Sequence, residues 1–156
     1  MPYKMYLLDR HPDVKEKVCE FFKSIEWAVR SFITDRMPDA DYFKCHNNLP
    51  QILIGQSLFR ENFKVKKQIN IEIDLDGQRL VVLAFVYINS GPGRSGRAFV
   101  LEPIPLTALI ADVQAKLEEA LQKISAVPEK DLVFMGDMAE EVKRQRELVN
   151  AEPIFC

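Results

Sequence analysis

Cysteine and histidine are scarce in this chain of 156 residues, and the lack of each disfavours certain classes of function. The three cysteines, Cys19, Cys45 and Cys156, are an odd number and form no Cys-x-x-Cys pair. Such usage is typical of free thiols, so we expect a reducing, cytoplasmic location. Of the two histidines, His11 and His46, neither stands in a recognisable nucleophile motif. The sequence therefore offers no serine or cysteine with an evident histidine base, and we expect no enzyme.

Long apolar runs and a strong charge of either sign are also lacking. No window approaches the 18 uncharged apolar residues of a membrane span, and residues 1–10 lack the apolar core of a signal peptide. The formal net charge of −2 disfavours a protein that coats nucleic acid through its overall field. We expect no membrane partner, and any basic site must be local.

Metal and cofactor sites are likewise poorly supported. The polar connection over residues 37–50 contains Asp39, Asp41, Cys45 and His46, but it lacks the paired ligands of a zinc site. Gly91, Gly93 and Gly96 spell G-x-G-x-x-G, which in a dinucleotide-binding loop opens a helix. Here a strand follows instead, and Pro92 removes one backbone donor. We interpret residues 90–97 as a flexible loop and expect no metal or cofactor.

What the chain does have is the composition of one globular domain over residues 1–156, with 47% hydrophobic residues. A long helix is predicted from Pro12 to about Pro38, because apolar residues recur at the 3.6-residue period. Its apolar stripe is broad enough to pack under several elements or to face a partner. The apolar positions are Val14, Val18, Phe21, Phe22, Ile25, Ala28, Val29, Phe32 and Ile33.

The clearest pattern is a β-hairpin over residues 69–88. Three isoleucines alternate with polar residues from position 69 to 74, and Asp76-Gly77 is a favoured two-residue turn. This turn sets the register, in which Ile73 faces Leu80. The second strand is then apolar on both faces, so a helix of this chain or another subunit must cover its far side.

The remaining segments complete an α+β fold. We predict a third strand over residues 97–102, a helix over 107–124, a short edge strand over 132–135 and a peripheral last helix over 137–150, while residues 52–54 and 58–59 stay unassigned. The expected architecture is an antiparallel sheet of three to five strands, built on the 69–88 hairpin and packed by the long N-terminal helix and a C-terminal helix.

Positive side chains near these strands are the candidate partner-binding residues. They are Arg94, Ser95, Arg97, Lys64, Lys66 and Lys67. Lysines at a strand edge also discourage aggregation, and this protective role is the simpler interpretation of the three lysines. Basic residues mixed with Phe43, Phe59 and Phe63 are alternatively suited to single-stranded nucleic acid.

The sequence therefore favours a non-enzymatic, cytoplasmic protein-binding module. An adaptor, a chaperone-like protein, and an inhibitor or regulator of a larger protein all fit, and the broad first helix favours a homodimer. The alternative is a protein that binds nucleic acid or another anion through the Gly/Arg loop and the lysine-rich strand edge. Function inferred from fold class alone is weak, so both hypotheses depend on where these side chains lie.

Overall fold

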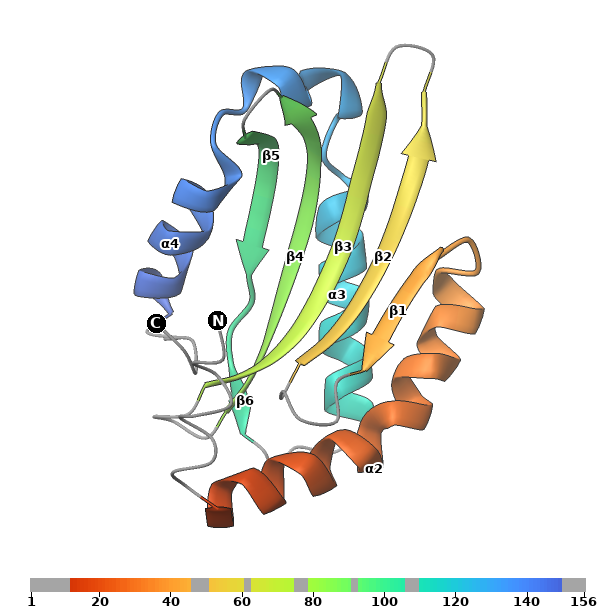
Figure 1. The fold of residues 1–156 in the computed structure, drawn as a ribbon, viewed down its shortest axis with the longest axis vertical. Helices are drawn as coiled ribbons and strands as arrows, with labels where there is room; N and C mark the ends of the chain where they lie inside the picture. Colours follow the sequence, from red (N-terminus) through yellow and green to blue (C-terminus); the bar gives the residue numbers. More distant parts are fainter. Residues whose placement is uncertain are drawn as a thin grey trace.

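The computed structural model describes residues 12–45, 51–60, 63–74, 79–90, 93–105 and 110–149. An antiparallel sheet with the strand order β1-β2-β3-β4-β5 dominates it, and β6 pairs with β4 (Figure 1). The strands are β1 (Tyr42–Cys45), β2 (Gln51–Phe59), β3 (Lys64–Asp74), β4 (Arg79–Ser90), β5 (Gly93–Val100) and β6 (Ile104–Pro105). The helices are α2 (Pro12–Arg36), α3 (Ile110–Ser125), the 3₁₀ helix η1 (Glu129–Phe134) and α4 (Met138–Leu148).

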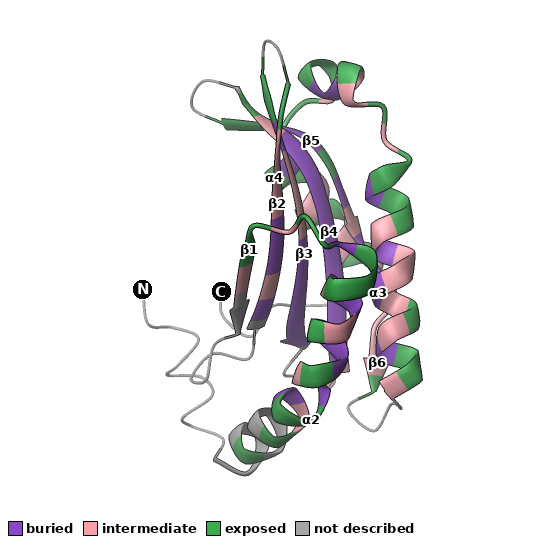
Figure 2. Ribbon diagram, turned by 90° about the vertical axis from the view of Figure 1, so that its right-hand side faces the viewer, coloured by how far each residue is buried: buried purple, intermediate pink, exposed green. Residues whose placement is uncertain are grey.

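This arrangement confirms the α+β class, with six strands in the sheet. Helices α2 and α3 lie on one side of the sheet, which we call the inner face (Figure 2). The opposite side is the outer face. Within the described ranges, no helix is both long and apolar enough to cross a membrane.

The main core lies between the inner face and these two helices. Ile69 and Ile71 of β3 are fully buried there, and α2 and α3 contribute fully buried Val29 and Leu117. The predicted hairpin register is confirmed, since Ile73 pairs with Leu80 and the other described pairs follow in step. The Asp76-Gly77 turn itself lies outside the described residues.

A smaller core lies on the outer face of β4 and β5. Val81, Leu83, Phe85 and Tyr87 of β4 are all buried there. Helix α4 packs its thin apolar row, Met138, Val142 and Val149, against this cluster. The described helices of this chain thus contact both faces of the central strand, without a second subunit.

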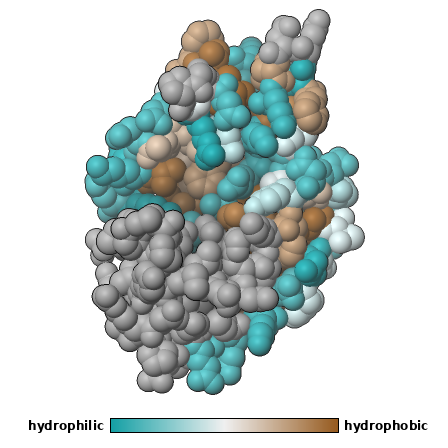
Figure 3. All heavy atoms as spheres, in the orientation of Figure 1, coloured by the Kyte–Doolittle hydropathy of each residue, from teal (hydrophilic) through white to brown (hydrophobic). Residues whose placement is uncertain are grey.

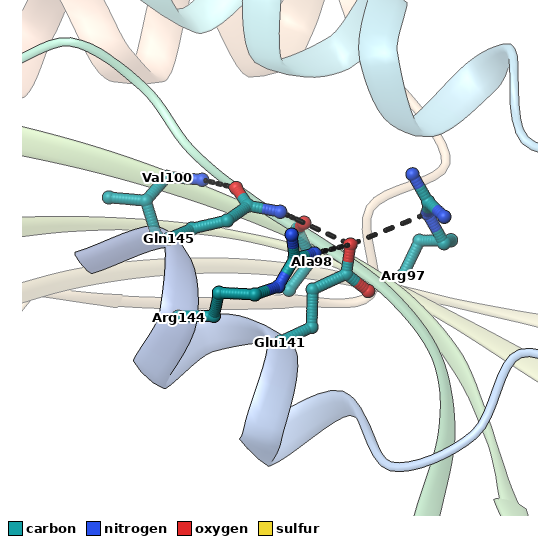
Figure 4. A network of polar contacts seen from close by, with 6 residues as sticks. All are labelled: Arg97, Ala98, Val100, Glu141, Arg144 and Gln145. Atoms are coloured by element: carbon teal, nitrogen blue, oxygen red, sulfur yellow. Dashed lines mark hydrogen bonds and ion pairs between the residues drawn. The ribbon is translucent and has the colours of Figure 1, made fainter. Parts of the chain in front are cut away.

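Helix α4 also occupies the free edge of β5 (Figure 4). The Gln145 side-chain amide donates to the Ala98 carbonyl at 2.6 Å and accepts from the Val100 N–H at 2.7 Å. The Gly96 N–H donates to the Gly136 carbonyl at 3.3 Å. One glutamine side chain therefore satisfies the edge groups that a neighbouring strand would otherwise pair.

Four expectations for local structure were wrong. The lysines Lys64, Lys66 and Lys67 do not lie on an edge strand, because β3 pairs with β2 on one side and with β4 on the other. Residues 93–97 do not belong to a loop, because β4 continues to Ser90 and β5 already begins at Gly93 and ends at Val100, while residues 91–92 lie outside the described ranges. Residues 132–135 are not an edge strand, since η1 covers 129–134 with Leu132 buried and with Val133 and Phe134 exposed. The connection over 37–50 contains β1, and residues 51–59 form the single strand β2.

Candidate binding surface on the outer face

Strand alternation divides the six predicted site residues between the two faces of the sheet. Successive side chains of a strand point to opposite sides, and register partners share a side. Lys66 pairs with buried Tyr87 of the outer cluster, which places Lys64 and Lys66 on the outer face. Arg94 also lies there, because its guanidinium covers the Tyr87 ring. Lys67, Ser95 and Arg97 alternate with these residues and belong to the other side.

The three residues outside the outer face each have a partner within the chain. The Ser95 hydroxyl donates to the Leu132 carbonyl at 2.6 Å and is buried. The Lys67 Nζ lies 4.0 Å from the Glu129 carboxylate. The Arg97 Nε reaches around the sheet edge to within 3.6 Å of the Glu141 carboxylate (Figure 4). These contacts join η1 and α4 to the sheet, so they give Ser95, Lys67 and Arg97 a structural role.

The three cations of the outer face are arranged differently. The Lys64 Nζ lies 4.9 Å from the centroid of the Phe59 ring, and the Arg94 Cζ lies 5.0 Å from that of Tyr87. Lys66 stands beside Tyr87 on the neighbouring strand. Among the described residues, none of these cations forms an ion pair. Ring contacts orient Lys64 and Arg94 without neutralising their charges, and no described carboxylate neutralises Lys66.

A hollow of about 380 Å³ lies next to these cations. Gly55 has no side chain, and the Tyr42 ring lies over it. A Cβ built on Gly55 would be 3.3 Å from that ring. Asp41 is the one carboxylate among the described lining residues, and it accepts a hydrogen bond from the Ser57 N–H. The described lining residues are Asp41, Tyr42, Leu53, Gly55, Gln56, Ser57, Lys66, Lys67, Gln68 and Tyr87.

Exposed rings add an apolar component to this surface. Phe59 beside Lys64 is 75% exposed, and Tyr42 at the hollow is 43% exposed. Hydrophobic and hydrophilic side chains stand close together over the upper part of the outer face (Figure 3). We call the set Tyr42, Phe59, Lys64, Lys66, Tyr87 and Arg94 the cation–ring surface. It can hold anionic and apolar groups at the same time.

The described carboxylates whose pKa is shifted do not line the hollow, and each is paired with an arginine of this chain. Hydrogen bonds from the Arg36 guanidinium, at 2.6 and 2.8 Å, lower the pKa of Glu118. The Arg60 guanidinium similarly lowers the pKa of Glu129. Within the described ranges, His, Cys, Asp and Glu form no group of three suited to a metal ion. His11, His46 and Cys156 lie outside those ranges.

The third glycine of the G-x-G-x-x-G string has a packing role. A Cβ on Gly96 would lie 2.1 Å from the Val86 carbonyl oxygen and 2.6 Å from the Tyr87 Cα. Only glycine fits so close to the backbone of β4. Gly93 meets nothing within 4 Å, and Gly91 lies outside the described residues.

Sequence reasoning named the cations but missed the tyrosines beside them. The sequence did show which lysine lies on which face. The alternation of the β3 isoleucines, continued toward the N-terminal end of the strand, puts Lys66 and Lys67 on opposite faces. Tyr42 carried no such signal, because β1 is short and was not recognised as a strand. Comparison of the chain with protein-family models, curated proteins and solved structures found no match.

Proposed function

We propose that this protein is a non-enzymatic binding module whose protein partner docks on the cation–ring surface. One observation carries the proposal: Lys64, Lys66 and Arg94 gather on one sheet face beside exposed rings and form no ion pair among the described residues. An isolated surface lysine needs no explanation, but three cations on one sheet face beside exposed aromatics and a hollow resemble the composition of an interface. The free-thiol cysteines support a cytoplasmic setting.

Nucleic acid is the second candidate, because cations and aromatic rings share this face. Single strands are held by stacking bases on open rings. Tyr87 is only 6% exposed and its ring is covered by Arg94. Tyr42 and Phe59 are the exposed rings, and the four-residue step along β2 from Gly55, the partner of Tyr42, to Phe59 separates them by about 13 Å. That spacing is too wide for two successive stacked bases, so the geometry favours a protein partner.

A pull-down that compares two variants tests the proposal. The bait is the full chain, and the lysate comes from the organism that encodes it. We expect Phe59→Ala/Tyr42→Ala to lose the proteins that the wild type retains, because exposed aromatics are frequent interface anchors. Trp27→Ala serves as the matched control, since Trp27 is an exposed ring on α2 at a distance from this surface. Equal retention of the same proteins by all three baits would contradict the proposal.

A further inference from the structure

We infer that the segment docking on the cation–ring surface is an acidic stretch of a protein in which carboxylate and apolar side chains occur together. This inference rests on the proposed function and specifies the chemistry of its partner. It selects one occupant over a nucleic acid, a neutral apolar segment or a second copy of this chain.

Charge complementarity is the first argument. Several described arginines are paired with carboxylates of the chain, whereas other described cations, Lys23 and Lys143 among them, form no ion pair within the described ranges. Arg36, Arg60, Arg146 and Arg97 each lie within 3.6 Å of a carboxylate of the chain. Lys64, Lys66 and Arg94 lack such a carboxylate among the described residues, although the chain as a whole carries two more acidic than basic residues. Carboxylates from outside would supply the missing partners.

The geometry of the hollow is the second argument. Lys66 and Gln68 lie on the same side of β3 and both line it, so an ammonium and an amide can donate to one bound group. Lys66 and Arg94 lie on either side of Tyr87, since Lys66 is its register partner and Arg94 covers its ring. A carboxylate above Tyr87 would be within reach of two cations.

The rings supply the third argument. Phe59 remains 75% exposed although it stands beside Lys64, and Tyr42 at the hollow is 43% exposed. A purely anionic ligand would leave these rings in water. A segment that alternates acidic with apolar residues would contact the cations and the rings together, which burying apolar area favours.

Fluorescence anisotropy at low salt tests the inference with three labelled probes. The first is an extended peptide of alternating Glu and Leu, the second is the same peptide with Gln in place of Glu, and the third is an oligo(dT) of equal length. We expect the Glu peptide to bind, the Gln peptide to bind about tenfold more weakly, and added salt to weaken the Glu peptide. The oligo(dT) should bind more weakly than the Glu peptide.

Two double variants complete the test. Lys66→Ala/Arg94→Ala should weaken the Glu peptide by about tenfold, because two charge-assisted contacts are removed. Lys23→Ala/Lys143→Ala removes the same charge from exposed sites on α2 and α4 and should leave the affinity unchanged. Equal loss in both variants would show an effect of net charge and would overturn the inference.

The outcomes separate this inference from the proposed function. If the Gln peptide binds as tightly as the Glu peptide, the acidic specificity is wrong while a docking surface remains. If oligo(dT) binds most tightly, both are wrong. If no probe binds while light scattering shows a dimer that Lys66→Ala/Arg94→Ala dissociates, the occupant is a second copy and the inference is overturned.

Discussion

Gly96 lies so close to β4 that the chain has no room for a methyl group there. Because a Cβ would lie 2.1 Å from the Val86 carbonyl oxygen, Gly96→Ala must separate the two strands. We expect a loss of about 3 kcal/mol in the free energy of unfolding, measured by urea denaturation. Gly93→Ala is the matched control, since nothing lies within 4 Å of its Cβ, and should change stability by less than about 1 kcal/mol. Equal stability of the two variants would contradict this account.

Glu129 is a second residue whose effect can be measured alone. Hydrogen bonds from Arg60 lower its pKa, so the ionised carboxylate stabilises the folded state at neutral pH. That contribution is present above the usual carboxyl pKa of 4.5 and is lost as the pH falls through the lower value of the folded state. Glu129→Gln should therefore have a lower urea midpoint than the wild type at neutral pH.

The difference between the two midpoints should shrink as the solution is made acidic. Glu102→Gln, at an exposed position without an ion pair among the described residues, is the control and should keep the wild-type midpoint at neutral pH. Because the Arg60–Glu129 pair is partly exposed, the effect is small and screened by salt. A difference that grew on acidification would have the wrong sign and would contradict the pairing.

At the scale of elements, α4 is held to the sheet by one side chain as much as by its apolar row. Gln145→Ala removes a donor to Ala98 and an acceptor for Val100, and each net hydrogen bond contributes about 1 kcal/mol. We expect a loss of about 2 kcal/mol and faster hydrogen exchange at the Val100 amide. Gln145→Glu keeps the acceptor for Val100 but turns a carboxylate oxygen toward the Ala98 carbonyl and the Glu141 carboxylate, so it should be at least as destabilising as Gln145→Ala. Gln122→Ala, at an exposed position of α3, is the control. Unchanged hydrogen exchange at the Val100 amide in Gln145→Ala would contradict the role of Gln145 at the edge of β5.

Elements with strong periodicity were predictable and elements with mixed patterns were not. Isoleucine alternation and a favoured turn determined the β3–β4 register, and the Asp137 cap of α4 was evident as an acceptor before a helix. In β2, the run Gly55-Gln56-Ser57 interrupts the apolar pattern, so one strand read as two fragments. The apolar run that became η1 had no period at all, and such short runs fit a strand or a helix equally well.

The candidate site was harder to predict because it depends on non-local pairing. Lys66, Tyr87 and Arg94 lie on three neighbouring strands, β3, β4 and β5, and meet only when all three strands are in register. Composition identified the cations. It could not show that Arg97 forms an ion pair with Glu141 on α4, while Arg94 lies over the Tyr87 ring. Contacts between elements of this kind are set by tertiary packing.

For the molecule as a whole, the structure alters the argument for a homodimer. The sequence left open whether a helix of this chain or another subunit covers the far side of β4, and α4 of the same chain packs against that outer face. We therefore expect light scattering at micromolar concentration to give the mass of one chain, 18.0 kDa. A mass of twice that value would restore the homodimer.

The two edges of the sheet also differ in what they allow under stress. On β5 the edge is sealed by Gln145 and Gly136, whereas no hydrogen bond within the described part of the chain closes the outer edge of β1. Head-to-tail growth into a fibre needs both edges and is blocked. Pairing of β1 with β1 uses the same edge twice and ends in a closed, two-fold assembly with a sealed strand at each end. Destabilisation of this protein should therefore yield discrete pairs before it yields filaments.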